Sequence, residues 1–156
     1  VAGAAHGIRD VGYRAIDTLR LEKGYLYWSS DISPDYTPYE AGLGFRVHLA
    51  AKGAFRGRAA LEAERATGPK RRLCTFITPA RLPLYGGETI LLGNRVASLV
   101  SSAGFGHTLG QTIVFGYLDT ADLAQEDFEI EVFGDRFPIR RADGPLYDPQ
   151  NLRLKG

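Results

Sequence analysis

Residues 128–141 read FEIEVFGDRFPIRR, and this stretch indicates the fold class of the second half of the chain. Apolar and charged residues alternate on both sides of Gly134-Asp135, a dipeptide typical of a two-residue hairpin turn. Alternation with a period of two buries one face of a hairpin and leaves the other in water. Charges of opposite sign would then face each other across the strands, and Pro138 indicates an edge or a bulge.

The rest of the second half shows the same character. Residues 88–92 and 95–100 flank Gly93-Asn94, which predicts a second hairpin. After residue 72, β-branched and aromatic runs alternate with glycine-containing turns, and no helical period is visible. Residues 72–156 are therefore predicted to form a small antiparallel barrel or sandwich, with the barrel as our choice.

The first half has a different periodicity. Apolar residues recur at helical spacing over residues 6–23 and predict an amphipathic helix that ends before Gly24. Residues 43–49 alternate well enough to predict a strand. Residues 57–66 have the composition of a second helix, ended by Gly68-Pro69. The whole chain is thus expected to be α+β, with the barrel of residues 72–156 packing on residues 1–68.

Composition narrows the class of partner. The hydrophobic fraction is 44% and the formal net charge is +1, so the overall charge gives no reason to expect nucleic acid or an anionic membrane as a partner. Cys74 is the single cysteine, which excludes an internal disulfide and a thiolate cluster. No apolar stretch approaches the roughly 20 residues that span a bilayer. We expect a cytoplasmic protein, or a matrix protein in a eukaryote.

Glu22 is the residue that the pattern singles out. With about 100° per residue in a helix, Glu22 projects between Val11 and Ala15 on the apolar face. An inward carboxylate must meet a cation, cap backbone donors or bind a ligand, because its burial alone costs several kcal/mol. Tyr13 and Arg20 project to the opposite side, so one straight helix cannot direct all three side chains at one small ligand.

Three other motifs carry no functional prediction. The glycines at residues 104–110 resemble a phosphate-binding loop, but a strand rather than a helix is expected after them, so they are interpreted as turn residues. Ser101-Ser102 lacks the Gly-x-Ser-x-Gly setting of a hydrolase nucleophile. The three histidines have no metal-like spacing to other ligands, and we predict no metal site.

Several motifs along nearly the whole chain resemble the glycine-cleavage T-protein, or aminomethyltransferase, superfamily. They are residues 13–25 (YRAIDTLRLEKGY), 37–45 (TPYEAGLGF), 55–61 (FRGRAAL), 106–110 (GHTLG) and 145–149 (PLYDP). The first and last are more similar to the version fused to flavin-dependent dimethylglycine and sarcosine dehydrogenases. The resemblance makes residues 1–68 the end of a folate-binding aminomethyltransferase domain and residues 72–156 its C-terminal β-barrel.

The resemblance also implies an activity, the transfer of a one-carbon unit from an N-methyl amine or aminomethyl donor to tetrahydrofolate. Glu22 would bind the pterin ring through a bidentate, charge-assisted contact. Tyr13, Arg20 and Leu21 match positions that border folate in the dehydrogenase-type relatives. The catalytic aspartate of such enzymes belongs to an earlier segment, so no catalytic residue is expected here. A parent protein could bind FAD, but not through this segment.

We therefore expect a fragment of a larger enzyme, inactive alone, whose partners are tetrahydrofolate and the missing N-terminal part of the same domain. One alternative is a folate-binding module without transfer activity that serves in assembly or regulation. Another is a structural barrel without a ligand.

Overall fold

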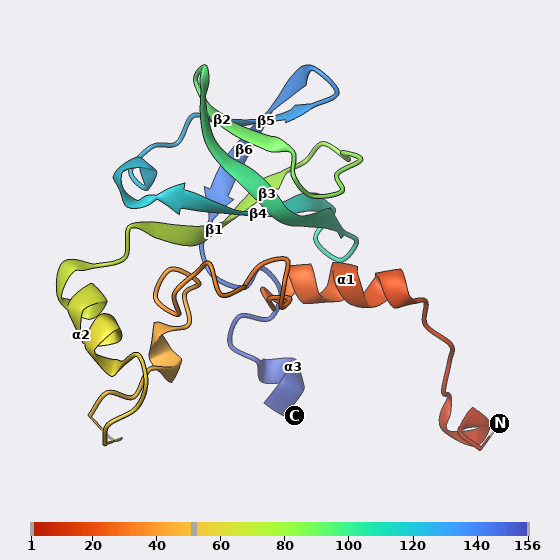
Figure 1. The fold of residues 1–156 in the computed structure, drawn as a ribbon. Coiled ribbons are helices and arrows are strands. Elements are labelled where there is room, and N and C mark those ends of the chain that lie inside the picture. The colour runs from red at the N-terminus through yellow and green to blue at the C-terminus, as the bar shows by residue number, and fades with distance from the viewer. Residues whose placement is uncertain (1, 51–52, 156) are drawn as a thin grey trace.

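A closed antiparallel barrel dominates the computed structural model, which describes residues 2–50 and 53–155 (Figure 1). Its strands follow the order β1-β4-β3-β2-β5-β6, and the β6–β1 pair closes the ring. The strands are β1 (Arg71–Thr78), β2 (Thr89–Leu92), β3 (Arg95–Gly106), β4 (Gln111–Asp119), β5 (Phe128–Val132) and β6 (Asp135–Ala142). The prediction of an antiparallel barrel is confirmed.

Both predicted hairpins are present. Leu92 pairs with Arg95 around Gly93-Asn94, as predicted. In the second hairpin Val132 pairs with Asp135, so the turn is Phe133-Gly134, one residue earlier than predicted. Both turn residues have positive φ, 53° and 89°, as a turn that follows the twist of the strands requires.

Charges face each other across the second hairpin as the alternation predicted. Arg136 pairs with Glu131 in the ladder and lies 3.7 Å from Glu129 and 4.0 Å from Glu131. Pro138 pairs with β5, whereas the ladder between β6 and β1 covers only Arg140 to Ala142. Pro138 therefore lies where β6 has one neighbour, as expected for a residue without an N–H group.

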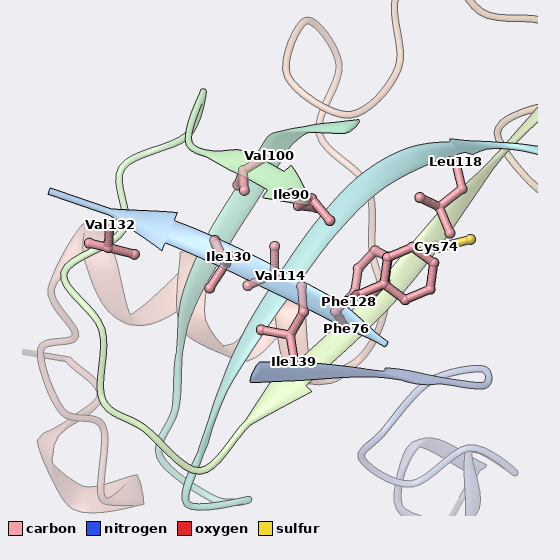
Figure 2. Close-up of a cluster of buried hydrophobic side chains, with 10 residues drawn as sticks. All are labelled: Cys74, Phe76, Ile90, Val100, Val114, Leu118, Phe128, Ile130, Val132 and Ile139. Atoms are coloured by element: carbon pink, nitrogen blue, oxygen red, sulfur yellow. The ribbon is translucent and has the colours of Figure 1, made fainter. Parts of the chain in front are cut away.

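Two clusters of apolar side chains stabilise the barrel and the packing of the first helix on its outer surface. The barrel interior is filled by ten buried side chains, shown in Figure 2: Cys74, Phe76, Ile90, Val100, Val114, Leu118, Phe128, Ile130, Val132 and Ile139. A second cluster on the outside joins Leu21 to Ile77, Ile113 and Phe115. Strand β4 contributes to both clusters, which explains why residues 112–118 are buried without interruption.

Helix α1 (Tyr13–Glu22) crosses the outside of the barrel next to β3 and β4 (Figure 1). The predicted start at residue 6 is wrong, because Gly7 has a left-handed φ of 71° and Gly12 is extended. The predicted burial of the apolar stripe is also wrong. Ile8, Val11, Ile16 and Leu19 are 51–66% exposed, and only the last two residues of the helix, Leu21 and Glu22, are buried.

The remaining elements are short and mostly lie at the surface. Helix α2 (Arg58–Thr67) confirms the predicted second helix, with Gly68 at its end. The strand predicted at residues 43–49 is wrong: a 3-10 turn, Gly44–Arg46, occupies this stretch. Two further 3-10 turns are Ala4–His6 and Thr120–Asp122, and helix α3 (Leu152–Lys155) comes last. Among the described residues, none of the helices has the length and apolarity needed to cross a membrane.

Candidate functional site

The carboxylate of Glu22 is buried at the end of α1. Its residue is 1% exposed, so the predicted inward orientation is confirmed. The backbone N–H of Thr108, in the turn between β3 and β4, donates to its Oε1 atom at 2.7 Å. Of the three alternatives that the sequence left open, the structure contains a backbone donor. Within residues 2–50 and 53–155 no cation forms an ion pair with this carboxylate.

Two glycines of β3 allow the helix to approach the barrel closely. A Cβ atom on Gly104 would lie 2.9 Å from Leu21 Cδ1. A Cβ atom on Gly106 would lie 3.1 Å from Glu22 Oε1 and 2.9 Å from Ile113 Cδ1. Contacts this short require a shift, so the absence of side chains at these two positions admits the buried end of α1.

The chain that follows β6 closes around the same helix end. The N–H groups of Leu146 and Tyr147 donate to the carbonyl oxygen of Glu22 at 3.1 and 2.9 Å. Lys23 Nζ lies 3.1 Å from Asp148 Oδ2 and donates to the carbonyl of Asp148 at 2.5 Å. The first two hydrogen bonds satisfy the Glu22 carbonyl, which the helix end otherwise leaves without a partner, and the Lys23 contacts hold the following segment against it.

Arg20 belongs to a separate polar network on the other side of α1. Its Nη1 atom lies 2.6 Å from Oδ2 of Asp31, and its Nη2 atom donates to Ser102 Oγ at 2.8 Å. Asp31 is fully buried and also accepts a hydrogen bond from Ser101 Oγ at 2.8 Å. Burial raises the pKa of the Tyr117 phenol, which stays protonated and donates to the carbonyl of Asp31 at 2.7 Å.

The four residues predicted to bind a cofactor therefore face two directions. Tyr13, Arg20 and Leu21 line one cavity of about 670 Å³ between α1 and the bulged part of β3. Glu22 lines neither this cavity nor a second one of about 850 Å³ beside Lys23 and β1. The helical projection anticipated this divergence, because Arg20 and Glu22 fall on nearly opposite sides of α1.

Sequence reasoning missed Asp31, Ser101, Ser102 and Thr108. Ser101-Ser102 was considered only as a hydrolase motif, and Asp31 lies in a turn whose composition is ordinary. No local signal marks the serines and Thr108, because their partners are 70 to 86 positions away. Asp31 lies 11 positions from Arg20, outside the helix that carries it. In the described part of the chain, no three side chains of the His, Cys, Asp and Glu types are grouped so as to hold a metal ion.

The structure thus combines a closed antiparallel barrel, a helix end packed on its outside and an acidic side chain buried at their junction. Residues 71–148 match the family model described as the glycine cleavage T-protein C-terminal barrel domain, and residues 1–51 match the GCVT N-terminal domain. The chain belongs to the glycine cleavage T-protein family, as its motifs predicted.

Curated relatives agree with this assignment. The chain is 39% identical over 163 residues to human mitochondrial sarcosine dehydrogenase, covering 99% of this chain and 18% of that protein. It is 37% identical over 147 residues to the aminomethyltransferase of Nostoc sp., covering 93% of this chain and 39% of that protein. It is 30% identical over 159 residues to rat mitochondrial dimethylglycine dehydrogenase, again covering 99% of this chain and 18% of that protein.

The fold agrees as well. The crystal structure of the glycine cleavage system aminomethyltransferase T from Bartonella henselae superposes with a TM-score of 0.81 at 27% identity. The match covers 89% of this chain and 40% of that one. The chain thus spans less than half the length of the relatives it matches.

Proposed function

We propose that this chain forms part of the tetrahydrofolate site of an aminomethyltransferase-type enzyme. The enzyme would transfer a one-carbon unit from an N-methyl amine or aminomethyl donor to tetrahydrofolate, within a protein similar to flavin-dependent dimethylglycine and sarcosine dehydrogenases. Residues 1–68 would be the end of the folate-binding domain and residues 72–156 its barrel. Support comes from membership of the family and from relatives named as aminomethyltransferase and sarcosine dehydrogenase.

The observation that carries the proposal is the buried carboxylate of Glu22. An ionised carboxylate has about four lone-pair sites, and it is stable in a buried place only when donors occupy several of them. Within the described residues, the N–H of Thr108 is the one hydrogen-bond donor to this carboxylate. The remaining acceptor capacity fits a ligand that presents adjacent N–H groups, as the pterin ring of tetrahydrofolate does.

Each residue of the helix end has a distinct part in the proposal. Glu22 would orient the ring, with Thr108 keeping one of its oxygens in place. Leu21 would hold the helix end against β3 and β4 behind Glu22, while Tyr13 lines the cavity on the Arg20 side of α1. Tetrahydrofolate, when bound, supplies the nitrogen atoms that accept the one-carbon unit. The acid or base for the transfer is expected from outside this chain.

Calorimetric titration of the full-length protein with tetrahydrofolate tests the proposal. Glu22→Gln keeps the shape of the side chain but removes the charge, and should weaken binding by about 2 kcal/mol or more. Glu131→Gln is the matched control, since that carboxylate is exposed on β5. Equal affinities of wild type and Glu22→Gln would remove Glu22 from the site. Binding without one-carbon transfer would instead identify the non-catalytic module.

A further inference from the structure

The buried ion pair between Arg20 and Asp31 joins the last turn of α1 to the loop that follows it and to the barrel. Their side chains are 10% and 0% exposed, and the pair is 2.6 Å long. The carboxylate of Asp31 also accepts hydrogen bonds from the N–H of Tyr27 at 2.9 Å and from Ser101 Oγ at 2.8 Å. A buried pair with this many supporting donors holds one geometry, because any displacement leaves a charge without partners.

A bulge in β3 provides the barrel side of this network. Val100 pairs with Gly116 and Ser102 pairs with Phe115, so Ser101 is the extra residue. In a regular strand, neighbouring side chains point to opposite faces. The bulge removes this constraint, so both serine hydroxyls lie beside the ion pair. Ser101 Oγ donates a hydrogen bond to Asp31, and Ser102 Oγ accepts one from Arg20. Bulges that redirect a side chain in this way are common beside functional sites.

The Nη1 and Nη2 groups of the Arg20 guanidinium donate hydrogen bonds within the protein. Nη1 donates to Asp31 and to the carbonyl of Tyr25, and Nη2 donates to Ser102. Nε is buried and has no hydrogen-bond partner among the described residues. The guanidinium carbon lies 4.4 Å from the centre of the Tyr27 ring, which covers one face. Arg20 lines the cavity beside Leu21, yet its charge is directed at Asp31.

We infer that Arg20 is a positioning residue for Glu22 and not a direct ligand of the cofactor, an inference that rests on the proposed function. Arg20 precedes Glu22 by two positions, so the two side chains leave α1 about 200° apart. The network on Arg20 fixes one side of the last turn, and the N–H of Thr108 fixes the carboxylate on the other. Together they set the rotation of the helix end and therefore the direction of the Glu22 carboxylate.

Two probes separate positioning from direct contact in the full-length protein: tetrahydrofolate, and tetrahydropterin, which has the ring but no glutamate tail. If Arg20 acts through Glu22, Arg20→Met lowers the affinity for both probes by the same factor, about tenfold or more. A loss confined to tetrahydrofolate would show that Arg20 binds the anionic tail and would overturn the inference. Arg136→Met, an exposed arginine on β6, is the control and should leave both affinities unchanged.

A second variant separates positioning from stability. Replacing both partners, in Arg20→Met/Asp31→Asn, removes the unpaired charge that a single change leaves and keeps an acceptor oxygen for Tyr27 N–H and Ser101 Oγ, so the unfolding midpoint should return toward wild type. Affinity should not return, because the helix end has lost its link to β3. Recovery of both stability and affinity would show that the pair only balances charge.

A milder change keeps the test usable if these variants fold poorly. Ser102→Ala removes one hydrogen bond to Arg20 and should lower the affinity for both probes equally, by about threefold. Unchanged affinity for both probes would contradict the inference. Failure of the wild type to bind either probe refutes the proposed function and the inference with it. Wild-type binding that depends on Glu22 but not on Arg20 refutes the inference alone.

Discussion

Replacing Gly106 by alanine tests how closely the barrel and the helix end are fitted. Gly106 closes β3, and its backbone has no positive φ that would itself exclude a side chain. An added Cβ would meet Ile113 Cδ1 at 2.9 Å, Glu22 Oε1 at 3.1 Å and Glu22 Cγ at 3.2 Å. Ile113 is fully buried in the cluster under α1, and Glu22 is held by Thr108, so neither neighbour can move freely.

The expected magnitude is a difference between two opposing effects. Overpacking a filled site costs about 1–3 kcal/mol. Alanine also restricts the unfolded chain, which stabilises a protein by about 0.4–1 kcal/mol where the native backbone accepts it. The net effect of Gly106→Ala should therefore be a destabilisation of about 1–2 kcal/mol. Because the displaced atoms include the carboxylate itself, the same change should weaken tetrahydrofolate binding under the proposed function.

Urea unfolding followed by tryptophan fluorescence measures the first effect, and calorimetric titration the second. Gly104→Ala is a graded comparison, since its Cβ would meet one atom, Cδ1 of the buried Leu21 at 2.9 Å, and it should destabilise less than Gly106→Ala. Gly53→Ala is the control, because nothing lies within 4 Å of an added Cβ there. A Gly106→Ala protein as stable as wild type, with unchanged affinity, would refute the reasoning that the helix end is tightly fitted against β3.

Two further predictions concern single residues. Ser29 has a φ of 76°, which costs a non-glycine residue about 1 kcal/mol, so Ser29→Gly should raise the unfolding free energy by about that amount. Ser30→Gly is the control, because Ser30 has no positive φ and its replacement should not stabilise the protein. Equal effects of the two changes would contradict the proposed backbone strain at Ser29. Burial opposes ionisation of Asp148, but the hydrogen bond from Lys23 and that from the N–H of Leu152 outweigh it and lower the pKa of Asp148. A carboxylate whose pKa is lowered by folding stabilises the folded state at pH values above its ordinary pKa, about 4. This stabilisation is lost as the pH falls through the lower pKa of the folded state. The stability difference between wild type and Asp148→Asn, measured by urea unfolding, should therefore shrink below about pH 4, and a pH-independent difference would contradict the ion pair.

The barrel could be predicted because its signals are local. Each hairpin is indicated by residues close together in the sequence: one by the alternation in residues 128–132, the other by the dipeptide Gly93-Asn94. Strand pairing follows directly from such local signals. Even the error of one residue in the second turn has a local cause. A turn with positive φ at both central residues accepted Phe133 and Gly134, so Asp135 could pair with Val132.

The first half was harder because the contacts of its buried residues are made with segments far away in the sequence. The periodic stripe of α1 is real, but Ile16 and Leu19 have more than half of their surface exposed, so periodicity gave the helix and not its buried side. Alternation at residues 43–49 predicted a strand, yet Gly44–Arg46 is a 3-10 turn. Within the described residues the barrel closes through its own six strands, which leaves no open sheet edge for another strand to join.

The candidate site, too, could be predicted from the sequence only in part. The burial of Glu22 was predicted, but through an apolar stripe that turned out to be exposed. The actual reason is that Gly104 and Gly106 admit the last turn of α1 to the barrel surface. The Arg20–Asp31 network escaped prediction because its serines come from a bulge 70 residues further along, and a bulge is visible only once the register of two strands is known.

These contacts suggest why a helix end, and not a loop, carries the buried carboxylate. Sites on helices and strands are held more precisely than sites on loops, and the last turn of α1 is fixed at three points. Arg20 is bound to Asp31 and the bulge, Glu22 Oε1 to the N–H of Thr108, and the Glu22 carbonyl to the chain after β6. Three attachments at different angles around one helical turn leave neither rotation nor translation free. The barrel supplies the Ser102 and Thr108 contacts directly and the contact to the Glu22 carbonyl through the segment after β6, while Asp31 comes from the loop after α1, so the barrel helps to fix the direction of a single charge in the proposed site.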